Sequence, residues 1–229
     1  MTLLAEGTSC LAKPASWLCW DYIRPRLGTI EHALYQHIEL SALALGLALI
    51  VAALLSGLAA LVPWSKSPIL AVLGLIYTIP SIALFVLLQP FFGITHATPV
   101  VIALVGYAQL LLVRNVLVGL EEVPEESIEA ARGLGYGRFQ LLLRVQLPLA
   151  LPAIMAGLRV TTVSTIALLT VGGVIEQGGL GQLMYDGFQN SRNAIVLVAV
   201  VLIVLLALVA DALLLVVQRL VTPWARVRS

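Results

Sequence analysis

The chain has 229 residues, of which 60% are hydrophobic and 11% are charged, and its formal net charge is +1. Soluble globular proteins contain roughly 45–50% apolar and about 25% charged residues, so the composition excludes an ordinary soluble domain. The near-neutral charge and the lack of a basic stripe argue against nucleic acid as a partner. Several apolar stretches are instead long enough to cross a bilayer, which takes roughly 20 helical residues.

Residues 1–37 form an N-terminal tail. Around Asp21, Arg24 and Arg26 it carries Trp17, Trp20, Tyr22 and Ile23, a composition that suits a segment lying among lipid headgroups. The tail has no basic stretch followed by an apolar one, so no cleavable signal peptide is expected. Its two cysteines, Cys10 and Cys19, lack the spacing of a zinc site and are interpreted as unpaired thiols. The histidines also lack metal-ligand spacing and are expected to be interfacial polar residues: His32, His37 and His96.

A transmembrane domain over residues 38–217 is predicted to hold five spans, at about 38–62, 68–90, 98–119, 147–172 and 194–217. A helix beginning near Thr29 should lead into the first span. Pro80 lies inside the second span and should kink it, either as a fixed structural feature or as a hinge. A cytoplasmic loop over 120–146 and a C-terminal tail over 218–229 complete the organisation.

The orientation follows from lysine and arginine, which concentrate in cytoplasmic loops. In a five-span chain, the connections after the first and third spans and the C-terminal tail share one side. These segments carry most of the basic residues: Lys66, Arg132, Arg138, Arg144, Arg219, Arg226 and Arg228. The N-terminus is therefore predicted to lie outside and the C-terminus in the cytoplasm, although Lys13, Arg24 and Arg26 in the outer tail run against this rule.

Two ionisable residues are predicted to lie at membrane depth, Arg159 in the fourth span and Asp211 in the fifth. A central arginine costs roughly 2.5–3.5 kcal/mol on the insertion scale, so it should face protein or water. A structural role and a role in lining a pathway are equally open for both residues, and the two could pair. The glycines near 172–179 either line the exit of such a pathway or end the fourth span.

The loop between the third and fourth spans is predicted to form a short helix, a glycine turn and a second short helix. Pro124 suits the start of a helix, and Glu125 and Glu126 would then lie at the positive end of the helix dipole. Glu129 and Arg132 can pair at a spacing of three residues. The small side chains of two consecutive alanines on an exposed helix would let another surface approach closely.

This loop resembles the EAA loop of ABC-importer permeases, because glutamate, two alanines, glycine, an aliphatic residue and Leu-Pro occur at that family's spacing. The matching residues are Glu129, Ala130, Ala131, Gly135, Val145, Leu147 and Pro148. Further stretches, YTIPSIALFVLL from Tyr77, LLVRNVLVGL from Leu111 and GGLG from Gly178, resemble the glycine betaine, carnitine and choline branch of these permeases.

The resemblance implies an all-α membrane protein with the type I ABC importer permease fold, in which the EAA loop couples to a cytoplasmic ATPase dimer. It implies three partners besides membrane lipids: that ATPase, a second permease subunit and an extracytoplasmic solute-binding protein. The chain has no G-x-x-x-x-G-K-[ST] loop, so we expect it to be non-catalytic and to bind no cofactor, with ATP and Mg²⁺ held by the ATPase.

The implied function is ATP-driven import of small quaternary ammonium solutes, with amino acids or a thiol-betaine as alternative cargo. A secondary carrier would need coupling carboxylates at mid-membrane, where only Asp211 is available, and no metal site or clustered enzyme site is visible. Tyr77, Pro80, Tyr107, Arg159 and Asp211 are the residues expected to line or gate the pathway. Since Tyr77 and Tyr107 are isolated in the sequence, an aromatic cage for the cation is expected on the binding protein instead.

Overall fold

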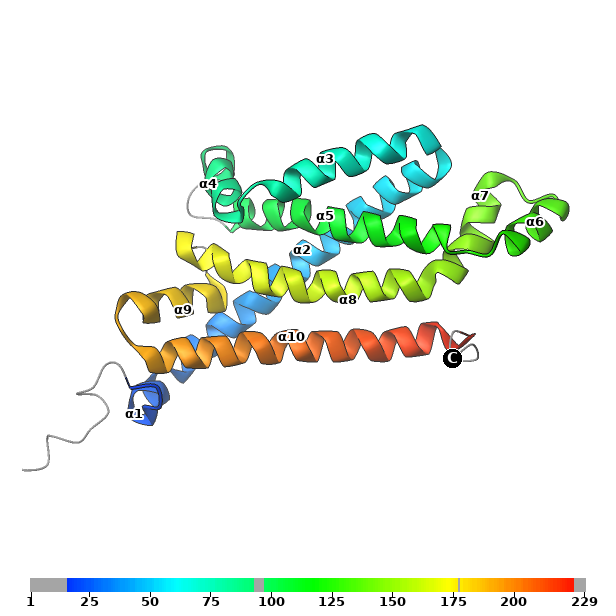
Figure 1. The fold of residues 1–229 in the computed structure, drawn as a ribbon. Coiled ribbons are helices and arrows are strands. Elements are labelled where there is room, and N and C mark those ends of the chain that lie inside the picture. The colour runs from blue at the N-terminus through cyan, green and yellow to red at the C-terminus, as the bar shows by residue number, and fades with distance from the viewer. Residues whose placement is uncertain (1–15, 93–96, 177, 225–229) are drawn as a thin grey trace, which may run out of the picture. The chain divides into compact units, whose positions relative to one another are not determined.

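The computed structural model describes residues 16–92, 97–176 and 178–224, which form helices and no strands. The long helices are α2 (Leu27–Leu61), α5 (Thr98–Glu121), α8 (Leu147–Gly172) and α10 (Asn193–Val221). Shorter helices precede or connect them (Figure 1): α1 (Trp20–Ile23), α3 (Lys66–Thr78), α4 (Ser81–Phe92), α6 (Glu125–Gly133), α7 (Arg138–Leu141) and α9 (Gly179–Gln189).

The helices are distributed over two compact units, and each long helix contributes to both. The first unit, called the outer unit after the predicted orientation, contains the chain up to Leu43 together with 81–103 and 166–207. The second unit, called the inner unit, contains 44–80, 104–165 and the chain from Leu208.

Within the described residues, four helical segments are long and apolar enough to cross a membrane. These are Trp20–Leu61, Thr98–Glu121, Arg138–Ile175 and Asn193–Val221. A fifth span exists if α3 and α4 are counted as one broken span. Pro80 was expected to kink a continuous helix, but here α3 ends at Thr78 and α4 begins at Ser81. The stronger effect has a physical basis, because proline lacks an N–H and its ring disfavours helical backbone in the residue before it.

The core of the inner unit depends on small residues of α2. Ala48, Ala52 and Ala59 recur at helical spacing and pack against Leu112 and Val113 of α5. Side chains this small allow the two helices to approach closely, which is a common way of packing helices in a membrane. The Gln109 amide of α5 donates a hydrogen bond of 3.1 Å to the Ala48 carbonyl, so a polar contact also fixes the register of the pair.

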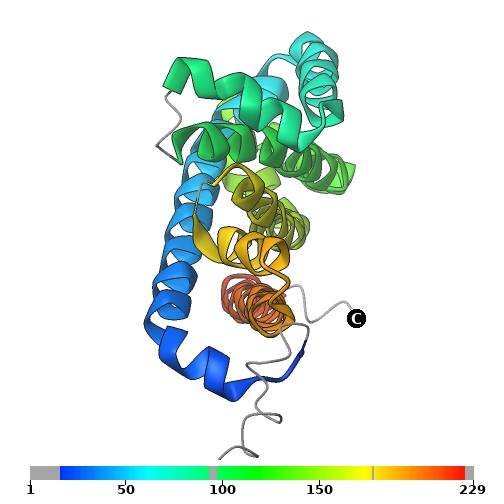
Figure 2. The ribbon, with the colours of Figure 1, turned by 90° about the vertical axis from the view of Figure 1, so that its left-hand side faces the viewer.

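The outer unit is held by packing around α9. Gly181 lies against the Thr170 backbone of α8, and Gly187 lies against Ile195 of α10, so α9 sits between the end of α8 and the start of α10 (Figure 2). Near the start of the described chain, Cys19 and Ile30 pack with Ile195 of α10 in a hydrophobic cluster of the outer unit.

Cys19 corrects one expectation from the sequence, because it is disulfide-bonded rather than an unpaired thiol. Cys10 lies outside the described residues, as do His96 and the basic residues Lys13, Arg226 and Arg228. The short helix α1 continues through a 3₁₀ turn that contains Pro25 and then into α2, which begins at Leu27. The helix that feeds the first span therefore begins close to the expected Thr29.

Candidate functional site

The EAA loop is organised by α6 and the turn that ends it. Helix α6 begins directly after Pro124, whose ψ of 130° is not helical, and it carries Glu125 and Glu126 in its first turn. At the other end, the Tyr136 N–H donates to the Ala131 carbonyl (3.1 Å) and the Gly135 N–H donates to the Arg132 carbonyl (2.9 Å). With Gly135 at a φ of 84°, these two bonds form a Schellman motif, which explains why glycine is needed there.

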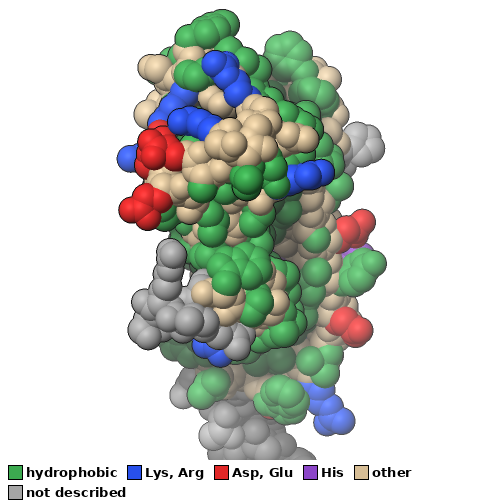
Figure 3. Space-filling model, turned by 90° about the vertical axis from the view of Figure 1, so that its right-hand side faces the viewer, with side chains coloured by type: hydrophobic (Ala, Val, Ile, Leu, Met, Phe, Trp, Pro, Cys, Tyr) green, Lys and Arg blue, Asp and Glu red, His purple; other side chains and the backbone are tan. Residues whose placement is uncertain are grey.

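The two alanines of the loop lie in different environments. Ala131 is buried with Ile128, against Leu141 and Leu142, whereas Glu129 and Ala130 are exposed. The expectation that both alanines would be exposed is therefore wrong for Ala131, which holds α6 against its own unit. Acidic and basic side chains lie near one another on the face from which α6 and α7 project (Figure 3).

The ion pair on α6 also differs from the expected one. Arg132 contacts Glu125 at 3.3 Å, at a spacing of seven residues, rather than Glu129 at a spacing of three. Both side chains are about two-thirds exposed, so the pair contributes at most about 1 kcal/mol. Because Arg132 pairs with Glu125, the carboxylate of Glu129 stays exposed beside Ala130 on the solvent-exposed face of α6.

The second half of the loop enters the membrane without a break. Helix α7 passes into a π-helical segment, Leu142–Gln146, and then into α8, whose second residue is Pro148. Pro148 has no N–H to donate, so this position of the helix contributes no backbone hydrogen bond to the preceding turn. Val145 is half-buried and Leu147 is exposed, so these residues of the EAA pattern lie on a continuous helix. Short π segments often occur at functional sites.

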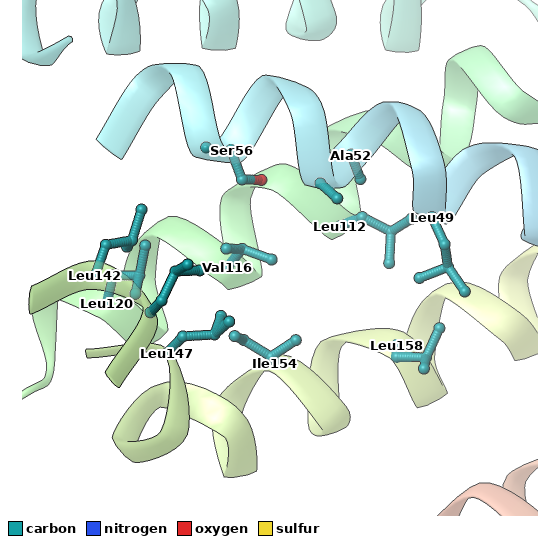
Figure 4. Close-up of a pocket in the computed structure, with 13 residues that line it drawn as sticks. Leu49, Ala52, Ser56, Leu112, Val116, Leu120, Leu142, Leu147, Ile154 and Leu158 are labelled. Carbon is teal, nitrogen blue, oxygen red and sulfur yellow. The ribbon is translucent and has the colours of Figure 1, made fainter. Parts of the chain in front are cut away.

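A cavity of about 310 Å³ lies beside this π-helical segment within the inner unit (Figure 4). Its wall on α2 includes Leu49 and the small residues Ala52, Ala53 and Gly57, and its opposite wall includes Leu142 and Leu147. The lining is apolar except for Ser56, whose buried hydroxyl has no hydrogen-bond partner among the described residues. The cavity therefore leaves free volume next to the segment that links the EAA loop to the membrane.

The two charges predicted at membrane depth lie in contact in the inner unit. Arg159 of α8 donates two hydrogen bonds of 2.8 Å to the two carboxylate oxygens of Asp211 on α10. This bidentate arrangement is the strong form of an arginine–carboxylate pair. The side chains remain 26% and 33% exposed, and a hollow of about 370 Å³ opens beside them.

Tyr77 and Tyr107 are also brought together, which corrects the expectation that they are isolated. Their ring centroids lie 6.0 Å apart and their planes meet at 74°, an edge-to-face contact. The Tyr107 hydroxyl donates to the Ile79 carbonyl, directly before Pro80. The structure thus joins three of the predicted pathway residues at the break after α3, while their roles in transport stay predictions.

A cluster of hydrogen-bonded residues in the outer unit was not predicted from the sequence. The Gly179 N–H donates to the Gln36 side-chain oxygen at 2.9 Å, and the His37 Nε2 lies 3.1 Å from the Ile166 carbonyl. His37 is fully buried rather than interfacial, and its Nδ1 has no partner among the described residues. The glycines were the only signal, since Gln36 and His37 look like ordinary polar residues in the sequence. The described residues contain no group of three His, Cys, Asp or Glu side chains that could hold a metal ion.

Known proteins resemble this chain over most of its length. The sequence profile of the family described as binding-protein-dependent transport system inner membrane component matches residues 36–225. The osmoprotectant import permease protein OsmW of Salmonella typhimurium is 38% identical over 206 residues, which are 88% of this chain and 96% of that protein. The choline transport system permease protein OpuBB of Bacillus subtilis is 30% identical, over 89% of this chain and 93% of that protein.

A solved structure supports the same architecture. An inward-facing form of the MetNI methionine ABC transporter matches 84% of this chain and 98% of its own chain, with a TM-score of 0.72. The sequence identity in this comparison is 21%, so the similarity concerns the fold alone.

Proposed function

Because this chain belongs to the family of binding-protein-dependent transport system inner membrane components, we propose that it conducts small quaternary ammonium solutes such as glycine betaine, carnitine and choline. It is the multi-pass permease subunit of an ABC importer and has the type I importer permease fold. The similarity to an osmoprotectant import permease over 96% of that protein is the observation that supports this class of solute.

The exposed face of α6 is proposed to dock onto a separate cytoplasmic ATPase dimer, which would hold the ATP and Mg²⁺. Glu129 and Ala130 supply a carboxylate and a small side chain on an accessible surface, and Gly135 sets the angle of the following turn. Closure of the ATPase dimer on ATP would then move α6, with the continuous helix from α7 into α8 transmitting the motion. Val145, Leu147 and Pro148 would act through that helix rather than by contact with the ATPase.

The pathway is proposed to form between this chain and a second permease subunit, with solute delivered from outside by a binding protein. Tyr77, Pro80, Tyr107, Arg159 and Asp211 are the residues that we assign to lining or gating it. The proposed orientation has the N-terminus outside, which the charge bias supports. The disulfide of Cys19 supports it as well, because disulfides persist in oxidising compartments.

Transport can be tested with the chain reconstituted in proteoliposomes with its cognate ATPase and binding protein. ATP-dependent uptake of labelled glycine betaine, carnitine or choline is the expected result. Uptake of amino acids or of a thiol-betaine alone would contradict the proposed solute class while leaving the importer assignment intact.

Orientation can be tested by single cysteines at positions 66, 138 and 192 in a cysteine-free background. An impermeant thiol reagent added to intact cells should label only Arg192→Cys. Labelling of Arg138→Cys from outside would overturn the proposed orientation.

A further inference from the structure

The pair of Arg159 and Asp211 lies far from both ends of its helices. Twelve residues of α8 precede Arg159 and thirteen follow it, while ten residues of α10 follow Asp211. Neither charge can therefore reach water simply by extending along its helix to the nearest headgroups. Ionisable side chains at such depth face protein or a water-filled space and are functional candidates.

The Arg159–Asp211 pair is only partly buried, which bears on its role. About a quarter of the Arg159 side chain and a third of the Asp211 side chain stay open in the inner unit. A purely structural ion pair in a membrane is expected to be covered by its own helices, since hydrocarbon solvates neither charge. The open part of this pair must therefore meet water, solute or another polypeptide.

The hollow beside the pair has the chemistry of a site for a small charged solute. Its volume is about 370 Å³, and its walls include Ala156, Val160, Val163 and Ser164. A guanidinium and a carboxylate thus lie side by side on a wall that is otherwise aliphatic apart from the Ser164 hydroxyl. A carboxylate can accept two parallel hydrogen bonds from a guanidinium. A quaternary ammonium has no N–H to donate, so it is recognised by negative charge and apolar contact.

We infer that Arg159 and Asp211 form a subsite that recognises zwitterionic quaternary ammonium solutes, an inference that rests on the proposed function. The solute carboxylate takes the place of Asp211 on the Arg159 guanidinium, and the solute cation lies against the released Asp211 carboxylate and Val160. Without solute the two side chains satisfy each other, which keeps both charges paired at membrane depth. The subsite discriminates betaines, which carry both charges, from choline, which carries only the positive one.

The test compares uptake of glycine betaine with uptake of choline in the reconstituted complex. Arg159→Gln removes the partner of the solute carboxylate and leaves Asp211 unpaired, so the betaine-to-choline ratio should fall about tenfold. Asp211→Asn leaves an unpaired guanidinium that repels choline, so the ratio should rise by a similar factor. A matched control is available in the Lys66–Glu121 pair of the same unit, which joins α3 to the end of α5. Lys66→Gln should leave the ratio unchanged.

A structural role would produce a different result. If the pair only held α8 to α10, both variants would lower uptake of the two solutes by one common factor, and the inference would be wrong. If a second permease subunit covered the pair, the variants would weaken the permease dimer on size-exclusion chromatography without changing the ratio, which would also overturn it.

A further variant tests the subsite if neither Arg159→Gln nor Asp211→Asn folds. Ser164→Leu narrows the hollow and leaves both charges in place, so it should reduce uptake of the larger carnitine more than that of glycine betaine. If Ser164→Leu took up carnitine and glycine betaine each at the rate of the unsubstituted chain, the subsite would be contradicted. An original chain that transports neither betaines nor choline would instead remove the proposed function, and the subsite with it.

Discussion

Two glycine-containing loops of this chain look alike in the sequence but are held in place by different means. In the outer unit, Gly178 has a φ of 86°, and a Cβ added there would overlap the side-chain amide of Gln36. In the inner unit, Gly135 has a nearly equal φ of 84°, but a Cβ added there would meet no atom within 4 Å. The chain packs closely against the outer loop at its glycine, whereas at Gly135 the inner loop leaves open space and glycine is required only by the backbone conformation.

The difference indicates how the two loops tolerate change. Around the outer loop, Gly179 binds Gln36, His37 is fully buried and Gly181 lies against the Thr170 backbone. A substitution at one of these packed positions should therefore disturb folding before it affects binding of a partner. Around the inner loop, Glu129 and Ala130 face solution, so a substitution there should disturb the partner and leave the fold intact.

The largest effect is expected from Gly181→Val in the outer unit. A Cβ at this position would overlap the backbone carbonyl of Thr170, which cannot move aside as a side chain can. We expect a loss of stability of at least about 3 kcal/mol and little folded protein on fluorescence-detected size-exclusion chromatography. Gly133→Ala is the control, because nothing lies within 4 Å of its added Cβ, and it should fold normally. A well-folded Gly181→Val protein would contradict the close packing of α8 and α9.

The next effect concerns coupling through Gly135→Val. A β-branched residue tolerates a φ of 84° poorly, so the turn after α6 should be distorted while the membrane helices stay folded. The expected result is normal insertion with loss of solute-stimulated ATP hydrolysis. Gly137→Ala, two residues later and at a φ of −71°, should retain coupling. Normal uptake by the Gly135→Val complex would remove the coupling role of this turn.

A smaller effect is expected from Glu129→Lys on the exposed face of α6. Reversal of an exposed charge should weaken binding of the ATPase about three- to tenfold and reduce solute-stimulated hydrolysis accordingly. The effect should decrease with added salt, because exposed charges are screened. Glu129→Gln should have a milder effect than the lysine, and equal affinity of all three proteins would show that this carboxylate does not face the ATPase.

The smallest effect should come from two buried serines of α2, of which only one has a hydrogen-bond partner among the described residues. Ser56→Ala removes a buried hydroxyl that has no partner among the described residues, so stability should stay constant or rise by up to about 1 kcal/mol. Ser41→Ala removes a hydroxyl that donates to the His37 carbonyl at 2.7 Å and should lower stability by about 1 kcal/mol. Thermal unfolding in one detergent would measure both, and equal losses would imply that Ser56 does have a partner.

The sequence by itself determined the features that obey local rules. Apolar stretches long enough to cross a bilayer predicted the long helices, because helix formation and burial in lipid depend on the residues of one segment. The EAA loop was predictable for the same reason. Its helix start after Pro124 and its glycine turn at 135 depend on contacts within about five residues, and the structure has both. The family resemblance also followed from residues at fixed spacing along the chain.

Only the tertiary structure decided which distant residues meet. Arg159 and Asp211 are 52 residues apart, and Gln36 and Gly179 are 143 apart, so their contacts depend on the register of separate helices. The register of two helices depends on the side chains at their contact, as with Ala48 and Ala52 of α2 against α5, and helical periodicity alone does not specify it. Burial of His37 and of Ala131 is decided in the same way. Each looks like a surface residue in its own segment, and it is buried only because another helix packs over it.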